Sequence, residues 1–280
     1  MRIASWNVNA LTVERLVRIW EWLDYAQPDV ICLQETKQTD AAFPALDFHA
    51  RGYASVHHGE GRWNGVAIAS RVGLDDPVAG FGDGGPTDGE ARLISATCGG
   101  VRVSSVYVPN GRAVGSEHFH HKLQWLARLR AHVEAEEKLY GPGAPHGVAL
   151  CGDFNVAPDD IDVWSPAAFV GDTHVTPEER AAIAELEAHG LRDVFREQYP
   201  GEGDLFSWWD YRAGNFPKHR GMRIDLLMLS SPLAERVEWA FIDRNARKGQ
   251  KPSDHAPLFV DVDVDVPADG AGSPSADDVG

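Results

Sequence analysis

Short apolar runs bounded by turn residues recur along the chain and predict β-strands. These runs span residues 2–9, 29–35, 92–98, 101–108, 147–156, 223–230, 237–242 and 257–264. Two of them are separated only by Gly99 and Gly100, a dipeptide typical of a tight antiparallel hairpin. The pattern therefore predicts a strand-rich protein with at least one pair of antiparallel neighbours.

Two other segments have the spacing of amphipathic helices. The first covers residues 13–27 and ends before a proline. Its predicted apolar face consists of Val13, Leu16, Val17, Trp20 and Leu23. The second runs from residue 116 to about residue 140. Its apolar side chains, three or four residues apart, are Phe119, Leu123, Leu126, Leu129 and Val133.

Residues 176–190 carry the end signals of a third helix. Thr176 is the N-cap, Pro177 takes the first helical position, Glu179 completes a capping box and Gly190 follows the last turn. Strands and helices are thus interspersed, and no repeat or linker divides them. The pattern predicts one α/β domain over residues 1–265, with mixed sheets covered by helices. The Asp/Gly/Ser/Pro-rich residues 266–280 are predicted to form a disordered tail.

The composition, 43 % hydrophobic and 24 % charged over 280 residues, is typical of a globular protein. No apolar stretch is long enough to span a bilayer, and the first ten residues lack the apolar core of a secretory signal. A cytoplasmic protein without a membrane partner is therefore expected. Cys32, Cys98 and Cys151 stand far apart, without the spacing of a zinc or redox motif, and are expected to be reduced core residues.

A net charge of −16 argues against a polyanionic substrate. The charge is unevenly distributed, however. Residues 261–280 contain six acids and no base, whereas 212–223 and 244–251 each contain four Lys or Arg and no acid. Such local basic patches are what contact with phosphates needs. Charge alone does not decide whether these two segments bind phosphates or are ordinary solvated loops.

Polar side chains suited to a metal or a phosphate lie at the ends of several apolar runs. They are Asn7, Asn9, Glu35, Tyr107, Asn110, Asp153, Asn155, Asp225, Asp254 and His255. Strand ends in α/β proteins commonly converge on one rim of a sheet, where ligands bind. Most of these residues also fit a structural role, as turn residues, a surface charge or a core tyrosine. Asp225 is harder to explain that way, because an acid between Ile224 and Leu226 in an apolar strand needs a partner such as a histidine.

The motifs that contain these residues occur in a recognisable order across residues 3 to 260. They are SWNVN, CLQETK, NGVAIASR, YVPNG, CGDFNVAP, SWWDYR, RGMRIDLLMLS and KPSDHAPL. The ordered set resembles the exonuclease III type apurinic/apyrimidinic endonucleases, within the endonuclease/exonuclease/phosphatase superfamily. SWWDYR and RGMRID are similar to the bacterial exonuclease III branch rather than to the superfamily's lipid phosphatases or sphingomyelinases. The resemblance implies a four-layer αββα sandwich of two mixed, largely antiparallel β-sheets flanked by helices.

The resemblance also implies an activity. The expected enzyme is a Mg²⁺-dependent DNA-repair nuclease, in which Mn²⁺ can replace Mg²⁺, that cuts the phosphodiester 5′ to abasic sites. It is expected to have 3′–5′ exodeoxyribonuclease activity and 3′-phosphatase or 3′-end-cleaning activity as well. Its expected partner is double-stranded DNA with abasic sites or blocked 3′ ends, and it is expected to act as a monomer.

Roles for the strand-end residues follow from the resemblance and from the needs of phosphodiester hydrolysis. Glu35 is the clearest metal ligand by resemblance. The other candidate ligands are Asn7, Asp153, Asn155, Asp254 and His255. Asp153 is expected to exchange a proton with water or the leaving group, and Asn155 to orient the water or the phosphate. The number of metal ions and the acid that activates water stay open.

His255 is expected to contact the phosphate. Asp225 would hold its other ring nitrogen, which fixes the tautomer and should raise the pKa of the histidine. Tyr107 offers a phenolic donor to a phosphate oxygen. These three residues complete the set of candidate catalytic groups with Asp153 and Asn155.

A second set of residues is expected to contact DNA. By resemblance, Trp208, Met222 and Ile224 form a small apolar pocket for a flipped abasic sugar, although Trp208 fits ordinary core packing nearly as well. The candidates for contacts with backbone phosphates are Asn110, Arg112, Arg212 and Arg220.

Two positions depart from the family pattern. The usual NGLR is here Asn9-Ala10-Leu11-Thr12, which lacks an arginine, and Trp63-Asn64-Gly65 stands where relatives often carry Tyr or His before a Gly-Val strand. Neither touches the expected chemistry, but both bear on the strength of DNA contact. Two alternatives stay open: another phosphoesterase of the superfamily acting on a lipid or small phosphoester, and a catalytically silent DNA-binding protein. The basic stretches oppose the first, and the complete set of acid, amide and histidine side chains opposes the second.

Overall fold

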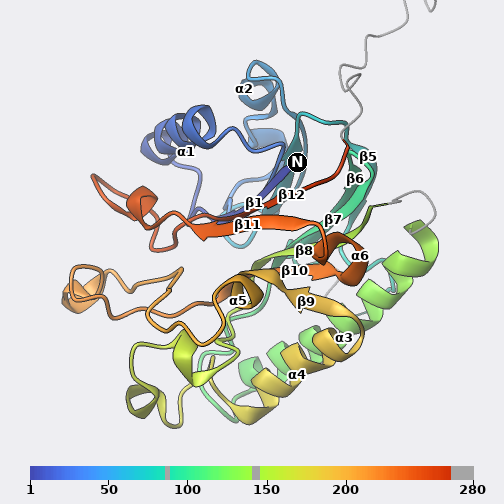
Figure 1. Ribbon diagram of the computed structural model, residues 1–280. Coiled ribbons are helices and arrows are strands. Elements are labelled where there is room, and N and C mark those ends of the chain that lie inside the picture. Colours follow the sequence, from blue (N-terminus) through green and yellow to red (C-terminus); the bar gives the residue numbers. More distant parts are fainter. Residues whose placement is uncertain (86–88, 141–145, 266–280) are drawn as a thin grey trace, which may run out of the picture.

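The computed structural model describes residues 1–85, 89–140 and 146–265, and their strands form two six-stranded sheets (Figure 1). The first sheet has the order β11-β12-β1-β2-β4-β3 and the second β5-β6-β7-β8-β10-β9. The strands are β1 (Arg2–Asn7), β2 (Val30–Gln34), β3 (Ala54–His58), β4 (Val66–Ser70), β5 (Asp75–Ala79), β6 (Leu93–Cys98), β7 (Val101–Tyr107), β8 (Gly147–Asp153), β9 (Leu191–Asp193), β10 (Asp225–Ser230), β11 (Val237–Ile242) and β12 (Leu258–Val262). Among them, β1 with β2 and β7 with β8 are parallel pairs, and the other neighbours are antiparallel.

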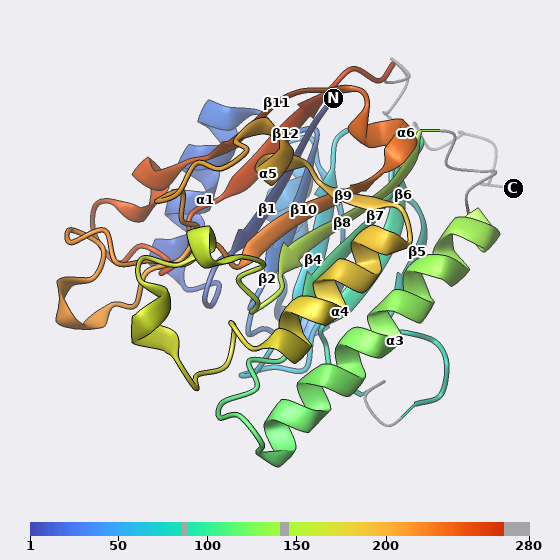
Figure 2. The ribbon, with the colours of Figure 1, turned by 60° about the horizontal axis from the view of Figure 1, so that its bottom comes forward.

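Helices cover the outer faces of both sheets, so the molecule has four layers (Figure 2). The first sheet carries α1 (Val13–Ala26) and α2 (Ala45–His49), and the second carries α3 (Glu117–Tyr140) and α4 (Pro177–Ala188). The connections contain shorter elements: η1 (Asp40–Ala42), η3 (Asp160–Asp162), η4 (Pro166–Phe169), α5 (Val194–Gln198), η5 (Arg212–Gly214), α6 (Ser231–Ala234) and η6 (Arg244–Arg247). The expected αββα sandwich of mixed, largely antiparallel sheets is confirmed.

Apolar side chains fill the three spaces between these layers. The inner faces of the two sheets share one cluster that includes Ile3, Val103 and Leu227. A second cluster joins α1 and α2 to the first sheet, and a third joins α3 and α4 to the second. Central strands are thus buried on both faces, which explains why they are continuous apolar runs in the sequence.

Two local predictions are confirmed. Gly99 and Gly100 both adopt positive φ (54° and 80°), as a tight hairpin requires, and Cys98 pairs with Val101 across the turn. Helix α4 begins with the predicted capping box, in which the side chains of Thr176 and Glu179 each accept a hydrogen bond from the other's backbone N–H.

The predicted apolar face of α1 is wrong in part. Val13 is 77 % exposed and Val17 half exposed, whereas the buried face includes Ile19 and Trp22 with the predicted Leu23. The buried face differs from the predicted one because Ile19 and Trp22 pack against side chains of the first sheet. Spacing alone left two overlapping apolar stripes on this helix, and the shape of the sheet surface selects between them.

The strands that the pattern missed lie mainly at sheet edges. Strand β5 contains a proline and is largely exposed, and β3 is only half buried, so neither forms an apolar run. The predicted disordered tail, residues 266–280, lies outside the described residues. Within the described ranges, no helix is both long enough and apolar enough to cross a bilayer.

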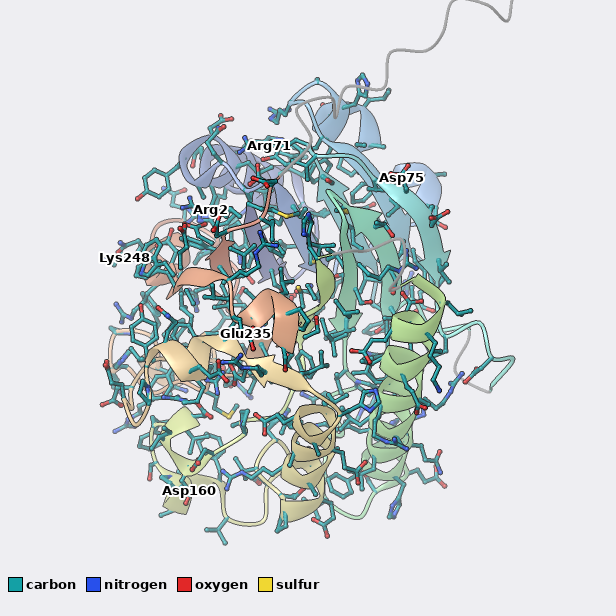
Figure 3. All side chains as sticks on the ribbon, turned by 45° about the vertical axis from the view of Figure 1, so that its right-hand side comes forward. Arg2, Arg71, Asp75, Asp160, Glu235 and Lys248 are labelled. Carbon is teal, nitrogen blue, oxygen red and sulfur yellow. The ribbon has the colours of Figure 1, made fainter. Side chains whose placement is uncertain are left out.

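Ion pairs close one end of the first sheet (Figure 3). Arg2 Nε lies 2.7 Å from Asp261 Oδ1, and Arg71 Nε lies 2.9 Å from Asp29 Oδ1. Asp29 also accepts the backbone N–H of Arg2 at 2.6 Å. Because Arg2 and Asn7 are the two ends of β1, this end is remote from the polar end described below.

A fully buried ion network ties the loop before β10 to the second sheet. The guanidinium of Arg223 donates to both oxygens of Asp162, at 2.6 and 3.0 Å, and to Asp193 at 2.7 Å. Arg196 adds a bond of 2.5 Å to Asp162. Although burial alone raises it, these two arginines hold the pKa of Asp162 below its ordinary value.

We expect Asp162→Ala to lower the free energy of unfolding by about 3–5 kcal/mol at neutral pH, because it leaves a buried arginine partly unpaired. The measurement is urea denaturation. The native carboxylate stabilises the fold above the ordinary Asp pKa and loses that effect as pH falls through its depressed folded-state pKa, so the difference should shrink in acid. The control is Asp210→Ala, which breaks the exposed pair with Arg212 and should cost less than about 1 kcal/mol. Equal losses in the two variants would contradict this account.

Candidate active site

Strands from both sheets bring polar side chains to one end of the sandwich. Asn7 is the last residue of β1, and Glu35 follows the parallel neighbour β2. In the second sheet, Tyr107, Asp153 and Asp225 are register neighbours on β7, β8 and β10. The convergence predicted from strand ends is therefore present, and it includes residues separated by more than 200 positions.

The amide of Asn7 joins the two sheets at this end. Its Nδ2 donates to Glu35 Oε1 at 2.8 Å and to Asp153 Oδ2 at 2.9 Å, while its Oδ1 accepts from the backbone N–H of Asn9 at 3.0 Å. Asn7 is completely buried. Asn7 therefore positions two carboxylates through its Nδ2, while its Oδ1 already accepts a hydrogen bond from Asn9.

Three side chains are close enough to bind one cation. Glu35, Asp153 and His255 each bring a ligand atom within 4.8 Å of the others. Carboxylate oxygens suit Mg²⁺. Two acids held together by one amide also repel each other, and a bound cation would relieve that repulsion. The donor set therefore fits a divalent metal, with Glu35 and Asp153 as its natural ligands.

The electrostatic environment of Asp153 is unusual for an aspartate. Burial raises its pKa to about 7, opposed by the charge of His255 and reinforced by those of Asp225 and Glu35. A carboxyl group with a pKa near neutrality exchanges protons readily at physiological pH.

His255 is held by Asp225 as the sequence predicted. Its Nδ1 lies 2.8 Å from Asp225 Oδ2, and its Nε2 lies 3.7 Å from Asp153 Oδ2. Burial alone lowers the pKa of His255, but the charges of Asp225 and Asp153 raise it to about 10. An imidazolium has two donors and no lone pair. This charge state favours contact with a phosphate over ligation of a metal.

The phenol of Tyr107 lies beside Glu35 at the same site. Burial raises its pKa well above its ordinary value, and the charges of Glu35 and Asp153 raise it further. Tyr107 is thus kept protonated, which is the form that donates a hydrogen bond.

Asn155 is positioned from three sides. Its backbone N–H donates to Asp153 Oδ1 at 2.9 Å, its side-chain amide donates to the carbonyl of Val108 at 2.9 Å, and its Oδ1 accepts from Asn110 Nδ2 at 3.2 Å. Its φ of 50° is left-handed, a strained conformation for a residue with a side chain. Asn110 and Asn155, which were predicted for different roles, are therefore adjacent and fixed relative to Asp153.

Two residues that sequence reasoning missed hold the backbone of Asn155. Lys122, fully buried, donates to the Asn155 carbonyl at 2.6 Å and pairs with Glu179. His174 Nδ1 lies 2.5 Å from the same carbonyl, and its Nε2 lies 3.3 Å from Asn110 Nδ2. Burial lowers the pKa of His174 to about 4, aided by the charge of Lys122, so this ring is neutral. The signal for Lys122 was present in the sequence, since it lies on the apolar stripe of its helix.

Asp254 lies at the edge of the site, outside the group of three possible ligands. Its Oδ1 accepts from Asn9 Nδ2 at 2.9 Å, and its Oδ2 accepts from Trp208 Nε1 at 3.1 Å. Asn9 in turn accepts from Lys37 Nζ at 2.7 Å, which lies 2.9 Å from Glu35 Oε2. Lys37 is a further site residue that sequence reasoning did not single out, although it stands two positions after Glu35.

The three predicted pocket residues lie together. Met222 and Ile224 belong to a small apolar cluster against which Trp208 packs, and the backbone of Trp208 pairs with that of Met222. Trp208 also bridges to His255, so the cluster adjoins the polar site. The neighbouring Trp209 is completely buried, whereas Trp208 is only partly buried. Trp208 thus packs against an apolar cluster on one side and has a partly exposed surface on the other.

The three predicted phosphate-binding arginines are placed less closely. Arg112 follows Asn110, whose Oδ1 accepts its backbone N–H at 3.2 Å. The guanidinium of Arg220 lies over the ring of Trp164, 4.8 Å from its centroid. Arg212 is exposed and paired with Asp210. The structure shows no contact between these guanidinium groups and the carboxylates or histidine of the site.

Comparison with known proteins agrees with this geometry. A model of the Endonuclease/Exonuclease/phosphatase family matches residues 4–255. Exodeoxyribonuclease III of Haemophilus influenzae is 34 % identical over 278 residues, which cover 93 % of this chain and 99 % of that protein. Exodeoxyribonuclease of Bacillus subtilis is 33 % identical over 268 residues, which cover 94 % of this chain and all of that protein.

Solved structures are similar over the same length. An AP endonuclease from Archaeoglobus fulgidus superposes with a TM-score of 0.87 at 37 % identity, covering 94 % of this chain and all of that one. A 3′ phosphatase from Neisseria, bound to a product DNA hairpin, has a TM-score of 0.88 at 35 % identity with the same coverage. The chain therefore belongs to the endonuclease/exonuclease/phosphatase family and is a nuclease of its exonuclease III type.

Proposed function

We propose that this nuclease uses Mg²⁺, or Mn²⁺ in its place, to hydrolyse the phosphodiester 5′ to abasic sites in duplex DNA. We include 3′–5′ exonuclease and 3′-phosphatase activities of the same site. The observation that carries the proposal is the convergence of Glu35, Asp153 and His255, whose ligand atoms lie within 4.8 Å of one another, with Asp225 holding the ring of His255. The similar proteins named above, an AP endonuclease and a 3′ phosphatase among them, support this choice of substrates.

Glu35 and Asp153 are the residues that would hold the cation, which supplies positive charge to offset that of the scissile phosphate. Asn7 keeps these two acids in place through its Nδ2. Asp254 contributes from the edge of the site through Asn9 and Lys37. These contacts leave the carboxylates with little freedom to reorganise during the reaction.

The remaining side chains act on water and phosphate. Asp153, whose Oδ2 lies 3.7 Å from His255 Nε2, takes a proton from the attacking water or passes one to the leaving oxygen. His255 and Tyr107 donate hydrogen bonds to the phosphate, where negative charge grows in the transition state. Asn155, fixed at Asp153, orients the water or the phosphate.

Substrate selection is assigned to the surroundings of this site. Trp208, Met222 and Ile224 form an apolar wall against which an abasic sugar packs, and a lesion without a base costs least to turn out of the helix. Asn110, Arg112, Arg212 and Arg220 are assigned to the DNA backbone. Because all these groups come from one chain, we assign the activity to the monomer. We place the protein in the cytoplasm, where it acts on DNA.

We expect Asp225→Asn to lower the pKa of His255, because the variant removes a carboxylate that stabilises the imidazolium. In the wild-type protein the ring should stay charged between pH 6 and 8 and titrate near pH 10. The measurement is the ¹³Cε1 chemical shift of His255 as a function of pH, assigned by its absence in His255→Gln. An unchanged titration in Asp225→Asn would refute the role given to this pair.

We expect Asp153→Asn to slow incision of a synthetic abasic duplex by about 10²–10⁴-fold, the usual size of an acid–base contribution. The measurement is single-turnover cleavage with Mg²⁺, and EDTA should abolish wild-type cleavage. The matched control is Asp47→Asn on the exposed surface of α2, which should cleave at the wild-type rate. Near-normal cleavage by Asp153→Asn, with its fold intact, would remove the mechanism.

Substrate preference is measured in the same assay. We expect the wild-type protein to act on the abasic duplex and on a nicked duplex that ends in a 3′-phosphate, and to leave inositol phosphates intact. Turnover of inositol phosphates in preference to DNA would favour the small-phosphoester alternative. Absence of any Mg²⁺-dependent turnover would favour a silent DNA-binding protein.

A further inference from the structure

Three arginines beside the candidate active site have no acidic partner in the described part of the chain. On α3, Arg130 pairs with Glu185. Arg15, Arg18 and Arg247, in contrast, form no ion pair with any residue of the described ranges, although the chain carries a net charge of −16. We call these three residues the arginine cluster. Positive charge left unpaired in such a chain suggests that the counter-charge comes from a ligand.

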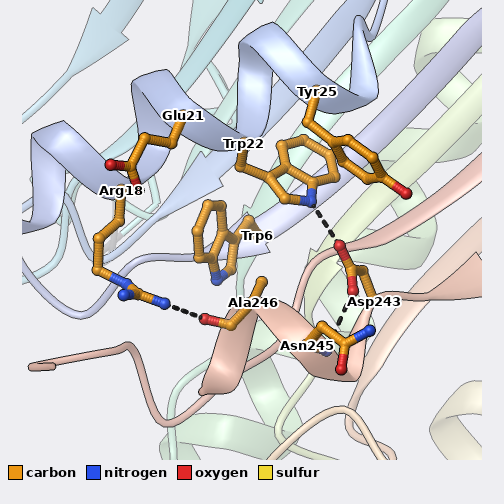
Figure 4. Close-up of a pocket in the computed structure, with 8 residues that line it drawn as sticks. All are labelled: Trp6, Arg18, Glu21, Trp22, Tyr25, Asp243, Asn245 and Ala246. Carbon is orange, nitrogen blue, oxygen red and sulfur yellow. Dashed lines mark hydrogen bonds between the residues drawn. The ribbon is translucent and has the colours of Figure 1, made fainter. Parts of the chain in front are cut away.

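Arg18 fixes the geometry of the cluster. From the second turn of α1, its Nη2 donates to the carbonyl of Ala246 in η6 at 2.8 Å (Figure 4). It also donates to the carbonyl of Lys248, the residue after η6, at 2.5 Å. Gly249 permits this approach, since a Cβ there would lie 2.9 Å from Arg18 Nη1. Arg18 therefore holds α1 and the segment that carries Arg247 together as one unit.

Arg15 and Arg247 lie largely inside this unit. Only 8 % of Arg15 and 7 % of Arg247 is exposed. The Nε and Nη1 of Arg15 and the Nε of Arg247 are buried without a hydrogen-bond acceptor. Buried donors are normally paired, and leaving them unpaired is costly. The described part of the chain thus presents donors for an acceptor that it does not itself provide.

The charges of the cluster also oppose one another. Burial lowers the pKa of Arg247, and the neighbouring charges of Arg15 and Arg18 lower it further, against the effects of Tyr211 and Asp254. The charge of Asp254 offsets part of this repulsion, but its two oxygens accept hydrogen bonds from Asn9 and Trp208, and within the described ranges it forms no ion pair with an arginine. An oxyanion with several acceptor sites would satisfy the buried donors and reduce the repulsion between the guanidinium groups. Guanidinium groups bind phosphate particularly well.

The cluster lies next to the candidate active site. Helix α1 begins four residues after Asn9, and the segment that carries Arg247 continues directly to Asp254. The exposed Lys248 extends the positive surface outward (Figure 3), whereas Lys251 is paired with Glu14. A DNA strand whose scissile phosphate reaches Asp254 and its neighbours therefore brings its flanking phosphates toward these arginines.

We propose that Arg15, Arg18 and Arg247 form a binding site for one backbone phosphate of the duplex, flanking the scissile phosphate. This proposal rests on the DNA nuclease function proposed above. The cluster keeps unpaired charge in the free protein so that DNA supplies the counter-charge. Such a contact adds affinity and fixes the register of the strand, but it carries no sequence information.

The experiment compares Arg15→Met and Arg247→Met with Arg130→Met, which removes the same charge from α3. Affinity for a fluorescein-labelled abasic duplex is measured by anisotropy in EDTA across a range of salt concentrations. Each cluster variant should bind about tenfold more weakly at low salt, the usual effect of losing a charged hydrogen bond. The slope of log K against log salt should fall in magnitude by about 0.9 for one lost phosphate. The control should match the wild-type protein in both.

Two further measurements distinguish a specific phosphate-binding site from a general effect of charge. Duplexes in which single phosphates are replaced by neutral methylphosphonate should reveal one flanking position that weakens wild-type binding but has no effect in the double variant Arg15→Met/Arg247→Met. The melting temperature of Arg15→Met should be no lower than that of the wild-type protein, because the variant relieves repulsion and removes unpaired donors. A loss of melting temperature without a loss of affinity would assign the cluster a structural role.

The outcomes distinguish this proposal from the proposed function. Wild-type salt slopes in both cluster variants would overturn the phosphate site while leaving the nuclease function intact. Cluster-dependent binding of a duplex that the wild-type protein does not cleave in Mg²⁺ would preserve the phosphate site and remove the nuclease function. Absence of salt-dependent duplex binding by the wild-type protein would overturn both.

Discussion

The two sheets of this protein are joined at their polar end by one buried amide. Asn7 ends a strand of the first sheet and donates to Glu35 on that sheet and to Asp153 on the second. Because each carboxylate is thereby held at a fixed place, their repulsion cannot relax by movement of the side chains. The suitability of the site for a divalent cation depends on this constraint. The pKa of Asp153 is raised chiefly by burial, and that of His255 by the charges of Asp225 and Asp153.

Buried polar contacts extend this constraint outward from the reacting groups. On one side, Lys122 and the neutral His174 fix the carbonyl of Asn155. On the other side, Asp254 connects Asn9 with the indole of Trp208, so the apolar pocket and the acidic site share a hydrogen-bonded wall. A network of this kind is costly if any member lacks a partner, but when satisfied it specifies a single arrangement. Pre-positioned groups of this sort are what stabilisation of a charged transition state requires.

The acidic composition and a polyanionic substrate are compatible because charge is distributed by position. Arginines on helical faces such as that of α3 are neutralised by nearby acids, as Arg130 is by Glu185. Around the candidate site, Arg15 and Arg247 remain unpaired within the described ranges, and burial makes their unsatisfied donors costly. Net charge therefore governs the long-range field of the protein, whereas local, desolvated groups govern contact with a phosphate at the site.

The sequence by itself determined the central strands other than β4, the capped helix at Thr176, the glycine hairpin and most of the site residues. Those features are local, because apolar runs, end caps and turn residues act over a few positions. The membership of Asn7, Glu35, Asp153, Asp225 and His255 in one site was predictable from motif order, and the tertiary structure places them together. Edge strands such as β5 escaped prediction because an edge needs no continuous apolar run.

Only the tertiary structure decided the rest. It placed Ile19 and Trp22 on the buried face of α1, buried Trp209 completely while leaving Trp208 partly exposed, and brought Lys37, Lys122 and His174 to the site. It also left the Nε and Nη1 of Arg15 and the Nε of Arg247 buried without a hydrogen-bond acceptor. The physical reason is that burial, pKa and hydrogen-bond satisfaction depend on neighbours from distant parts of the chain, and a local pattern of residue types does not specify those neighbours.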